Sequence, residues 1–286
     1  MNALVSQLLI GLINGCFYAI LSLGLAVIFG MLGLINFAHG AMFMLGAFAA
    51  WAGLVYFEIN YWVMLLLAPL VIGLVGALME SSVLRRVYKA DHLYALLLTL
   101  GIALVIEEIV RTIYGISGFT YLKTPIRGIF EVDGILVPKY RVWVIFASLI
   151  VCALTWYGIE KTKFGSYLRA ATEDPDLVET FGINVRLLRT VTYGCGVALA
   201  AYAGVLAIPV MQINPLTGRD LIIVIFAIVV IGGMGSIKGT ILVGIGLGLI
   251  EGLVRVFYPH ASSMTVFLLM VLVLIARPYG LFGDPE

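Results

Sequence analysis

The hydrophobic positions of the chain form long runs that are interrupted by short polar segments. The first of them, Met1 to Phe57, contains no Asp, Glu, Lys or Arg. A single helix over this stretch would extend about 85 Å at about 1.5 Å per residue, whereas the hydrocarbon core of a bilayer is about 30 Å thick. The stretch therefore predicts two membrane crossings.

The later runs are also apolar at consecutive positions, which is typical of membrane helices, because the strands of a transmembrane barrel alternate. The segment 221–236 ends in GGMGS and either crosses the membrane or turns back. We therefore predict an all-α, polytopic helical membrane protein, a single domain over residues 1–286, with eight or nine transmembrane segments, some broken. The expected spans cover roughly residues 8–33, 40–57, 61–84, 93–113, 141–160, 189–211, 221–231, 239–257 and 264–276.

Composition agrees with this class, since 62% of the residues are hydrophobic and only 12% are charged, against about 25% charged in soluble domains. A formal net charge of +1 gives no field that would attract nucleic acid. Cys16, Cys152 and Cys195 each lie alone in an apolar run, so we interpret them as core residues rather than metal ligands. The N-terminal run has no basic residue before it, and we expect no cleaved signal peptide.

Lysine and arginine residues between the spans predict the orientation, because cytoplasmic loops carry the excess. The sequence assigns ten of them to one side and five to the other, which places the loop around 161–189 in the cytoplasm and the loop 114–140 outside. Nine crossings would put the N-terminus outside and the C-terminus inside. The ten are Arg85, Arg86, Lys89, Lys161, Lys163, Arg169, Arg186, Arg189, Lys238 and Arg277; the five are Lys123, Arg127, Lys139, Arg141 and Arg219.

A polar segment, RAATEDPDLVETFGINVRLLR at 169–189, stands out from this apolar background with seven charged residues. Asp174 can cap a helix whose first residue is Pro175, and Gly182 allows a left-handed stop. The two-turn helix between them would carry Leu177, Val178 and Phe181 on one side. Such a short helix needs a surface to pack on, either its own chain or a soluble partner, and the local chemistry leaves both readings open.

Two glycine-rich segments with a polar residue, GMLGLINFAHG and GGMGSIKGT, resemble each other weakly. Broken helices at related positions indicate a transport pathway, whereas the alternative is an ordinary tight connection between spans. The candidate pathway residues are Asn36, His39, Gly40, Gly232, Gly233, Gly235 and Ser236. His39 has no second ligand at a useful spacing, so we predict no metal site. The second segment also lacks the consecutive GK[ST] of a phosphate-binding loop.

Charged residues within the apolar runs are the remaining candidates. Glu107 with Arg111, and Glu251 with Arg255, have the spacing of stabilising helical pairs. These two glutamates and Glu108 either line a pathway or are satisfied structurally. Gly244, Gly248 and Gly252 recur every four residues, which favours close packing of a neighbouring helix.

The runs INFAHGAMFMLGAF, RAATEDPDLVETFGIN, INPLTG, VVIGGMGSIKGTILVG and RPYGLFG together resemble the LivH-type permeases of branched-chain amino acid ABC importers, over nearly the whole chain. The resemblance implies that the polar segment is the cytoplasmic loop that docks on an ATPase, with Ala170, Asp174, Gly182 and Ile183 matching its motif. The coupling residues are then expected to be Ala170, Glu173, Asp174, Leu177, Val178, Glu179, Phe181 and Gly182.

The same resemblance implies the transport of branched-chain or related amino acids by alternating access in a bacterial inner membrane. The expected partners are a second related permease, two ATPases, an external solute-binding protein and membrane lipid, with no nucleic acid. This chain would bind no cofactor, and ATP and Mg would belong to the ATPases. The alternatives are a permease for urea or short amides, and a self-sufficient carrier or channel with Glu107, Glu108 or Glu251 as a relay. An intramembrane enzyme would need a catalytic constellation that the sequence does not contain.

Overall fold

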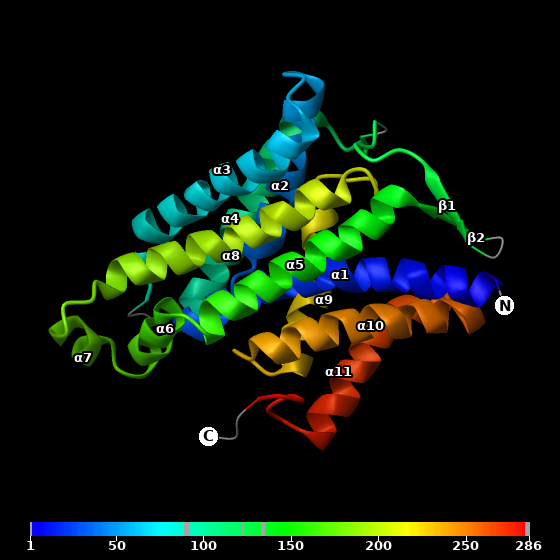
Figure 1. The fold of residues 1–286 in the computed structure, drawn as a ribbon. Coiled ribbons are helices and arrows are strands. Elements are labelled where there is room, and N and C mark those ends of the chain that lie inside the picture. Colours follow the sequence, from blue (N-terminus) through cyan, green and yellow to red (C-terminus); the bar gives the residue numbers. More distant parts are fainter. Residues whose placement is uncertain (1, 89–91, 122, 133–134, 284–286) are drawn as a thin grey trace.

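The computed structural model describes residues 2–88, 92–121, 123–132 and 135–283. Most of these residues form helices that run between two ends of an elongated bundle (Figure 1). The elements are α1 (Asn2–Leu32), α2 (Ala38–Val55), α3 (Tyr61–Ser82), η1 (Leu84–Arg86), α4 (His92–Tyr114), β1 (Ile129–Val132), β2 (Ile135–Pro138), α5 (Lys139–Glu160), α6 (Lys163–Glu173), α7 (Pro175–Thr180), α8 (Val185–Ala207), α9 (Thr217–Gly232), α10 (Ile237–Phe257), η2 (Pro259–Met264) and α11 (Thr265–Ala276).

Eight helical segments of the described chain are long and apolar enough to cross a membrane. This confirms the prediction of an all-α, polytopic membrane protein. The helix α9 is not among the eight, because it has 16 residues and extends about 24 Å, less than a hydrocarbon core. The choice between eight and nine crossings therefore depends on this short helix.

The two ends of the bundle differ in structure. The helices α6 and α7 form one end, at the left of Figure 1, which we call the α7 end. The other end carries an antiparallel hairpin in which Phe130 faces Val137 and Glu131 faces Leu136, and we call it the hairpin end. The sequence analysis predicted an external loop at 114–140 and named no secondary structure in it, so the hairpin is a new feature.

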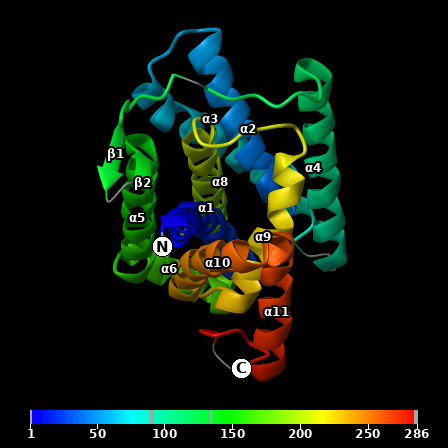
Figure 2. The ribbon, with the colours of Figure 1, turned by 90° about the vertical axis from the view of Figure 1, so that its right-hand side faces the viewer.

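The helix α1 lies in the centre, with α2, α5, α8, α9 and α10 around it and α4 and α11 at the periphery (Figure 2). Glycines bring α1 and α10 into backbone contact: a Cβ on Gly248 would overlap Gly15, and one on Gly244 would lie 2.8 Å from Ala19. A Cβ on Gly252 would likewise lie 2.6 Å from the carbonyl oxygen of Gln7 in α1. The prediction that these glycines serve helix packing is confirmed.

The connection between α1 and α2 is irregular backbone that is partly buried, since Leu34 and Asn36 are buried while Gly33 is exposed. The helix α2 begins there, and a Cβ on Gly40, in its first turn, would overlap the carbonyl oxygen of Gly218 in the first turn of α9. The segment before α9 is also partly buried. Ile213 is buried there, and its backbone exchanges N–H to carbonyl hydrogen bonds with the backbone of Phe119. Two helices thus begin beside each other within the bundle.

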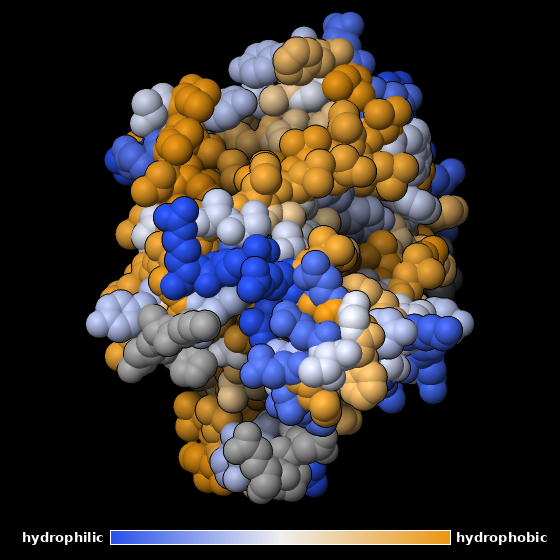
Figure 3. Space-filling view, turned by 90° about the vertical axis from the view of Figure 1, so that its left-hand side faces the viewer, coloured by the Kyte–Doolittle hydropathy of each residue, from blue (hydrophilic) through white to orange (hydrophobic). Residues whose placement is uncertain are grey.

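Basic residues separate between the two ends as the sequence predicted. Arg85, Lys161, Arg186 and Lys238 lie where α3, α5, α8 and α10 reach the α7 end, while Lys139 begins α5 at the hairpin end. Lys89 lies outside the described residues. Figure 3 looks onto the α7 end and shows hydrophilic residues gathered there, below a band of hydrophobic surface.

Candidate functional site

The centre of the polar segment, residues 174–182, folds as the sequence analysis predicted. The side chain of Asp174 accepts a hydrogen bond from the backbone N–H of Leu177 at 2.9 Å, and Pro175 is the first residue of α7. Gly182 has φ +80°, which is the left-handed conformation that ends the helix. The sequence analysis did not predict α6, which precedes α7 and packs against it.

A small hydrophobic cluster holds α6 and α7 to the bundle. Val178 of α7 is buried with Met31 of α1, Leu168 of α6 and Leu188 of α8. Gly165 allows α6 to turn under the end of α5, because a Cβ there would overlap the carbonyl oxygen of Ile159. The short helix therefore has the packing surface that a two-turn helix needs.

The apolar side chains of α7 do not share one face, which corrects the sequence prediction. Val178 is 5% exposed, whereas Leu177 is 53% and Phe181 76% exposed. Successive residues of a helix point about 100° apart, so Val178 turns inward while the i, i+4 pair of Leu177 and Phe181 turns outward. The inner face of the segment packs on its own chain, as one of the two readings predicted, and the packing of the outer face on a soluble partner stays a prediction. The remaining predicted coupling residues, Ala170, Glu173, Asp174, Glu179 and Gly182, are also exposed.

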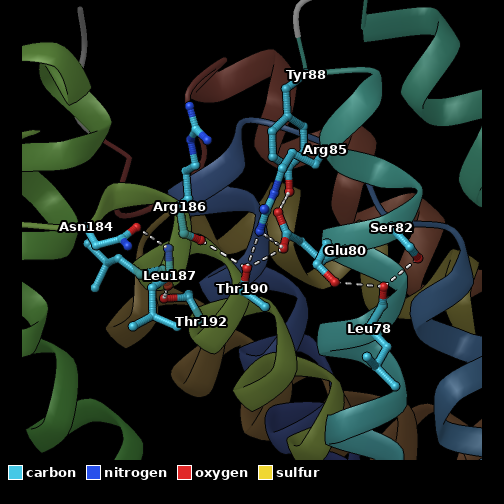
Figure 4. A network of polar contacts seen from close by, with 12 residues as sticks. Leu78, Glu80, Ser82, Arg85, Tyr88, Asn184, Arg186, Leu187, Thr190 and Thr192 are labelled. Carbon is cyan, nitrogen blue, oxygen red and sulfur yellow. Dashed lines mark hydrogen bonds and ion pairs between the residues drawn. The ribbon is translucent and has the colours of Figure 1, made fainter.

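A polar network that the sequence analysis missed fixes the start of α8, directly after this segment (Figure 4). Glu80 of α3 is completely buried and accepts hydrogen bonds from Thr190 at 2.6 Å, Tyr88 at 2.7 Å and Arg85 at 3.2 Å. Burial raises the pKa of Tyr88, and the hydrogen bond to the Glu80 carboxylate raises it further, so the phenol remains a donor. The missed signal was a lone carboxylate in the run 61–84.

The first group of predicted pathway residues stabilises the break before α2. The Asn36 side chain donates to the Tyr193 hydroxyl at 2.8 Å and accepts from the N–H of Ala38 at 3.1 Å. His39 is completely buried and donates from Nε2 to the carbonyl oxygen of Leu21 at 2.9 Å. Within the described residues its Nδ1 has no partner. Gly40 makes the close contact with α9.

The second predicted group forms the turn between α9 and α10 at the α7 end. Gly233 and Gly235 have φ +99° and +90°, and Ser236 caps α10 by accepting from the N–H of Gly239 at 3.2 Å. The chain near the C-terminus closes over this turn, where the N–H of Phe282 donates to Gly232 at 3.2 Å.

The first segment therefore joins α1 to α2 and the second joins α9 to α10, each through a short non-helical connection. They lie side by side, since Gly30 approaches Gly235 and the side chains of Ile35 and Met234 border one cavity of about 10 Å³. A role of either segment in substrate passage stays a prediction.

The charged pairs in the spans are partly different from those predicted. Glu251 bonds to Arg255 at 2.5 Å, as expected, and also accepts a hydrogen bond from Tyr18 of α1 at 3.1 Å. The predicted pair of Glu107 and Arg111 is wrong. Arg111 instead pairs with Glu108 at 2.9 Å, on the outer face of α4. Glu107 points into the bundle, where its partner is Arg219 of α9 at 3.5 Å.

Cysteine and metal chemistry add no further candidate. Cys16 and Cys152 are buried as predicted, but Cys195 is exposed, because it lies on a face of α8 that no other described element covers. Within the described ranges, no group of three or more His, Cys, Asp or Glu could hold a metal ion.

Comparison with known proteins identifies the family. A sequence model described as "Branched-chain amino acid transport system / permease component" matches residues 7–276. The chain belongs to this permease family. It is a transport subunit rather than an enzyme.

Curated relatives match the permease over nearly its full length. It is 29% identical to "High-affinity branched-chain amino acid transport system permease protein BraD" of Pseudomonas aeruginosa, over 99% of this chain and 96% of that protein. The protein LivH of Escherichia coli K12, with the corresponding name, gives the same identity and coverage. The protein LivM of the same strain is 28% identical over 92% of this chain and 67% of its own. No solved structure matches the permease significantly.

Proposed function

We propose that this permease is the membrane-spanning subunit of an ATP-driven importer for branched-chain or related amino acids. The α7 end faces the cytoplasm, where α7 docks on an ATPase. ATP and Mg bind to two such ATPases, and this chain binds no cofactor. A second related permease and an external solute-binding protein complete the assembly in the cytoplasmic membrane.

The exposed face of α7 is the observation that carries this proposal. Leu177 and Phe181 project from a short helix at the end of the molecule where hydrophilic residues gather. Large apolar side chains at such a place indicate a protein partner, and aromatic anchors dominate the binding energy of many interfaces. The excess of basic residues at the same end supports its cytoplasmic orientation.

The inner face of α7 supports a mechanical role. Val178 joins α7 to α1 and α8 through the cluster around Met31, and Glu80 ties the start of α8 to α3. Movement of α7 with a closing ATPase would therefore reach the centre of the bundle through packed side chains. Alternating access follows if the segments around Asn36 and Gly232, which lie side by side, rearrange in response.

The substrate assignment follows the names of the relatives, and urea or short amides remain the alternative within the importer class. A self-sufficient carrier or channel is the alternative outside it. In that case a glutamate of the spans would exchange protons or ions. Glu107, Glu108 and Glu251 are each paired with an arginine of the same chain, which agrees with a structural role for these glutamates and so supports the importer.

Purification of the permease together with candidate ATPases tests the proposal. The wild-type chain should retain its ATPase through washing in detergent, and a variant in which α7 (residues 175–180) is replaced by Gly and Ser residues should lose it while still inserting into membranes. Retention of the ATPase by that variant, or purification of an active transporter that contains this chain alone, would contradict the proposal.

A further inference from the structure

A cavity of about 170 Å³ lies beside the point where α2 and α9 begin. Its walls are almost entirely apolar and come from α2, α4, α9 and the segments just before α2 and α9; they include Phe37, Ala41, Met44, Leu104 and Ile222. Pockets for drug-sized ligands hold about 300–1,000 Å³, so this one fits a smaller molecule. Leu104 is 46% exposed, which leaves the cavity open between α4 and α9.

Two charged residues, Glu107 and Arg219, are among the residues that line this otherwise apolar cavity. Their closest N and O atoms are 3.5 Å apart, longer than the 2.7–2.9 Å or so of a charge-assisted hydrogen bond. Neither side chain makes a hydrogen bond to the rest of the described chain. Glu251 differs, because Arg255 and Tyr18 both bond to it. The pair in the cavity thus retains unused donors and acceptors.

We infer that this cavity is a transient binding site for a zwitterionic aliphatic amino acid on its way through the permease. Arg219 receives the α-carboxylate, Glu107 receives the α-ammonium group, and the apolar wall receives the side chain. This inference rests on the proposed function and assigns a place to its substrate.

Charge balance selects the ligand class. A zwitterion brings one positive and one negative charge to a pair that has one of each, so every charge meets an opposite one. An amino acid with a charged side chain would bring a third charge against the apolar wall, where it would be unpaired and costly. An aliphatic side chain gains free energy by burial at the same place.

The structure also allows Glu107 and Arg219 to move apart and admit a ligand between them. The helix α4, which carries Glu107, is peripheral, and its main helix contact is with α2 (Figure 2). Arg219 lies in the first turn of α9 and its side chain is 53% exposed. A small outward shift of α4 would widen the gap without disturbing the central helices.

The experiment uses the complete transporter, with the sister permease, ATPases and binding protein, in proteoliposomes. Glu107→Gln and Arg219→Gln should each lower the rate of leucine uptake by about tenfold or more, as expected for the loss of a hydrogen bond to a charged group. Glu108→Gln and Arg111→Gln make the same charge changes on the outer face of α4 and should leave uptake nearly unchanged. Equal effects of the two sets would overturn the inference.

A second pair of variants tests the volume of the cavity without changing a charge. Ala103→Leu fills the cavity that Ala103 lines, and should lower uptake of leucine more than uptake of alanine, if both are transported by the wild type. Gly101→Leu, at a position with no atom within 4 Å of a Cβ, is the matched control on the same helix. Indistinguishable uptake by these two variants would also overturn the inference.

Direct labelling covers the case in which a variant fails to assemble. A photoreactive diazirine analogue of leucine should cross-link to Met44 or Leu104 in the wild-type transporter, and excess leucine should suppress the cross-link whereas excess glutamate should not. Cross-linking elsewhere in this chain, without any at the cavity, contradicts the site. Absence of ATP-dependent uptake by the wild-type complex would instead contradict the proposed function, so the two failures are distinguishable.

Discussion

Replacing Phe181 by alanine separates docking from folding, because this side chain contributes little to its own chain. It is 76% exposed and lies outside the buried cluster that holds α7. Exposed substitutions of this kind change the free energy of unfolding by about 0.5 kcal/mol or less. Insertion, pairing with the sister permease and thermal stability of the permease should therefore stay near their wild-type values.

The effect on the ATPase should be much larger. An aromatic anchor at an interface contributes about 2 kcal/mol or more when truncated, which corresponds to a dissociation constant roughly 30-fold higher. Val178→Ala should behave differently, since Val178 is 5% exposed. Its truncation should loosen α7 at a cost of about 1–2 kcal/mol of local stability.

The assay measures binding of the ATPase to the permease pair in nanodiscs by interferometry. Phe257→Ala is the matched control, because Phe257 is 67% exposed at the hairpin end and the same atoms are removed. Phe181→Ala should raise the dissociation constant, and Phe257→Ala should not. An unchanged dissociation constant for Phe181→Ala would refute the docking role of this face.

Three further predictions concern coupling, charge and orientation. Gly182→Val should reduce ligand-stimulated ATP hydrolysis, because φ +80° costs an L-residue about 1–2 kcal/mol and a β-branched one more. Glu251→Leu should lower the amount of assembled complex, since Arg255 loses a partner worth about 1–3 kcal/mol, and the double replacement Glu251→Leu with Arg255→Met should restore assembly and uptake. In a cysteine-free background, cysteines at Asp176 and Thr124 should react with an impermeant thiol reagent from opposite sides of the membrane.

Each of these has a result that contradicts it. Gly182→Ala should show part of the loss of the valine variant, because no atom of the described chain lies within 4 Å of a Cβ there and only the backbone conformation opposes it; normal ATP hydrolysis by both variants would mean that this conformation is not required. A double variant at Glu251 and Arg255 that assembles but does not transport would place Glu251 in the pathway. Labelling of both cysteines from outside intact cells would overturn the orientation.

The sequence predicts the helices well because each span is a separate apolar run. The span expected at 93–113 is observed as His92–Tyr114, and the cap of α7 depends only on neighbouring residues. The short helix α6 was missed because its buried residues, Gly165, Leu168 and Ala171, are few and lie among polar ones.

The site was predicted less completely, because its partners come from distant elements. Spacing permits a pair between Glu107 and Arg111, but a single sequence does not show that Arg219 approaches from another helix and competes. In the same way, nothing local to Glu80 indicates Thr190, which lies 110 positions along the chain. The inward orientation of Val178 likewise depends on the surface on which α7 packs, which comes from α1, α6 and α8.

Uptake by proteoliposomes of defined composition tests the central claim, that this chain is the permease of an ATP-driven amino acid importer. The vesicles contain this chain and its sister permease with the ATPases, and the loaded binding protein is added on the opposite side. Accumulation of labelled leucine should require ATP on the ATPase side, the binding protein, and this chain, and it should stop when a hydrolysis-deficient ATPase is used. Leucine accumulation driven by this chain alone, in response to an ion gradient and without ATP, would contradict the account.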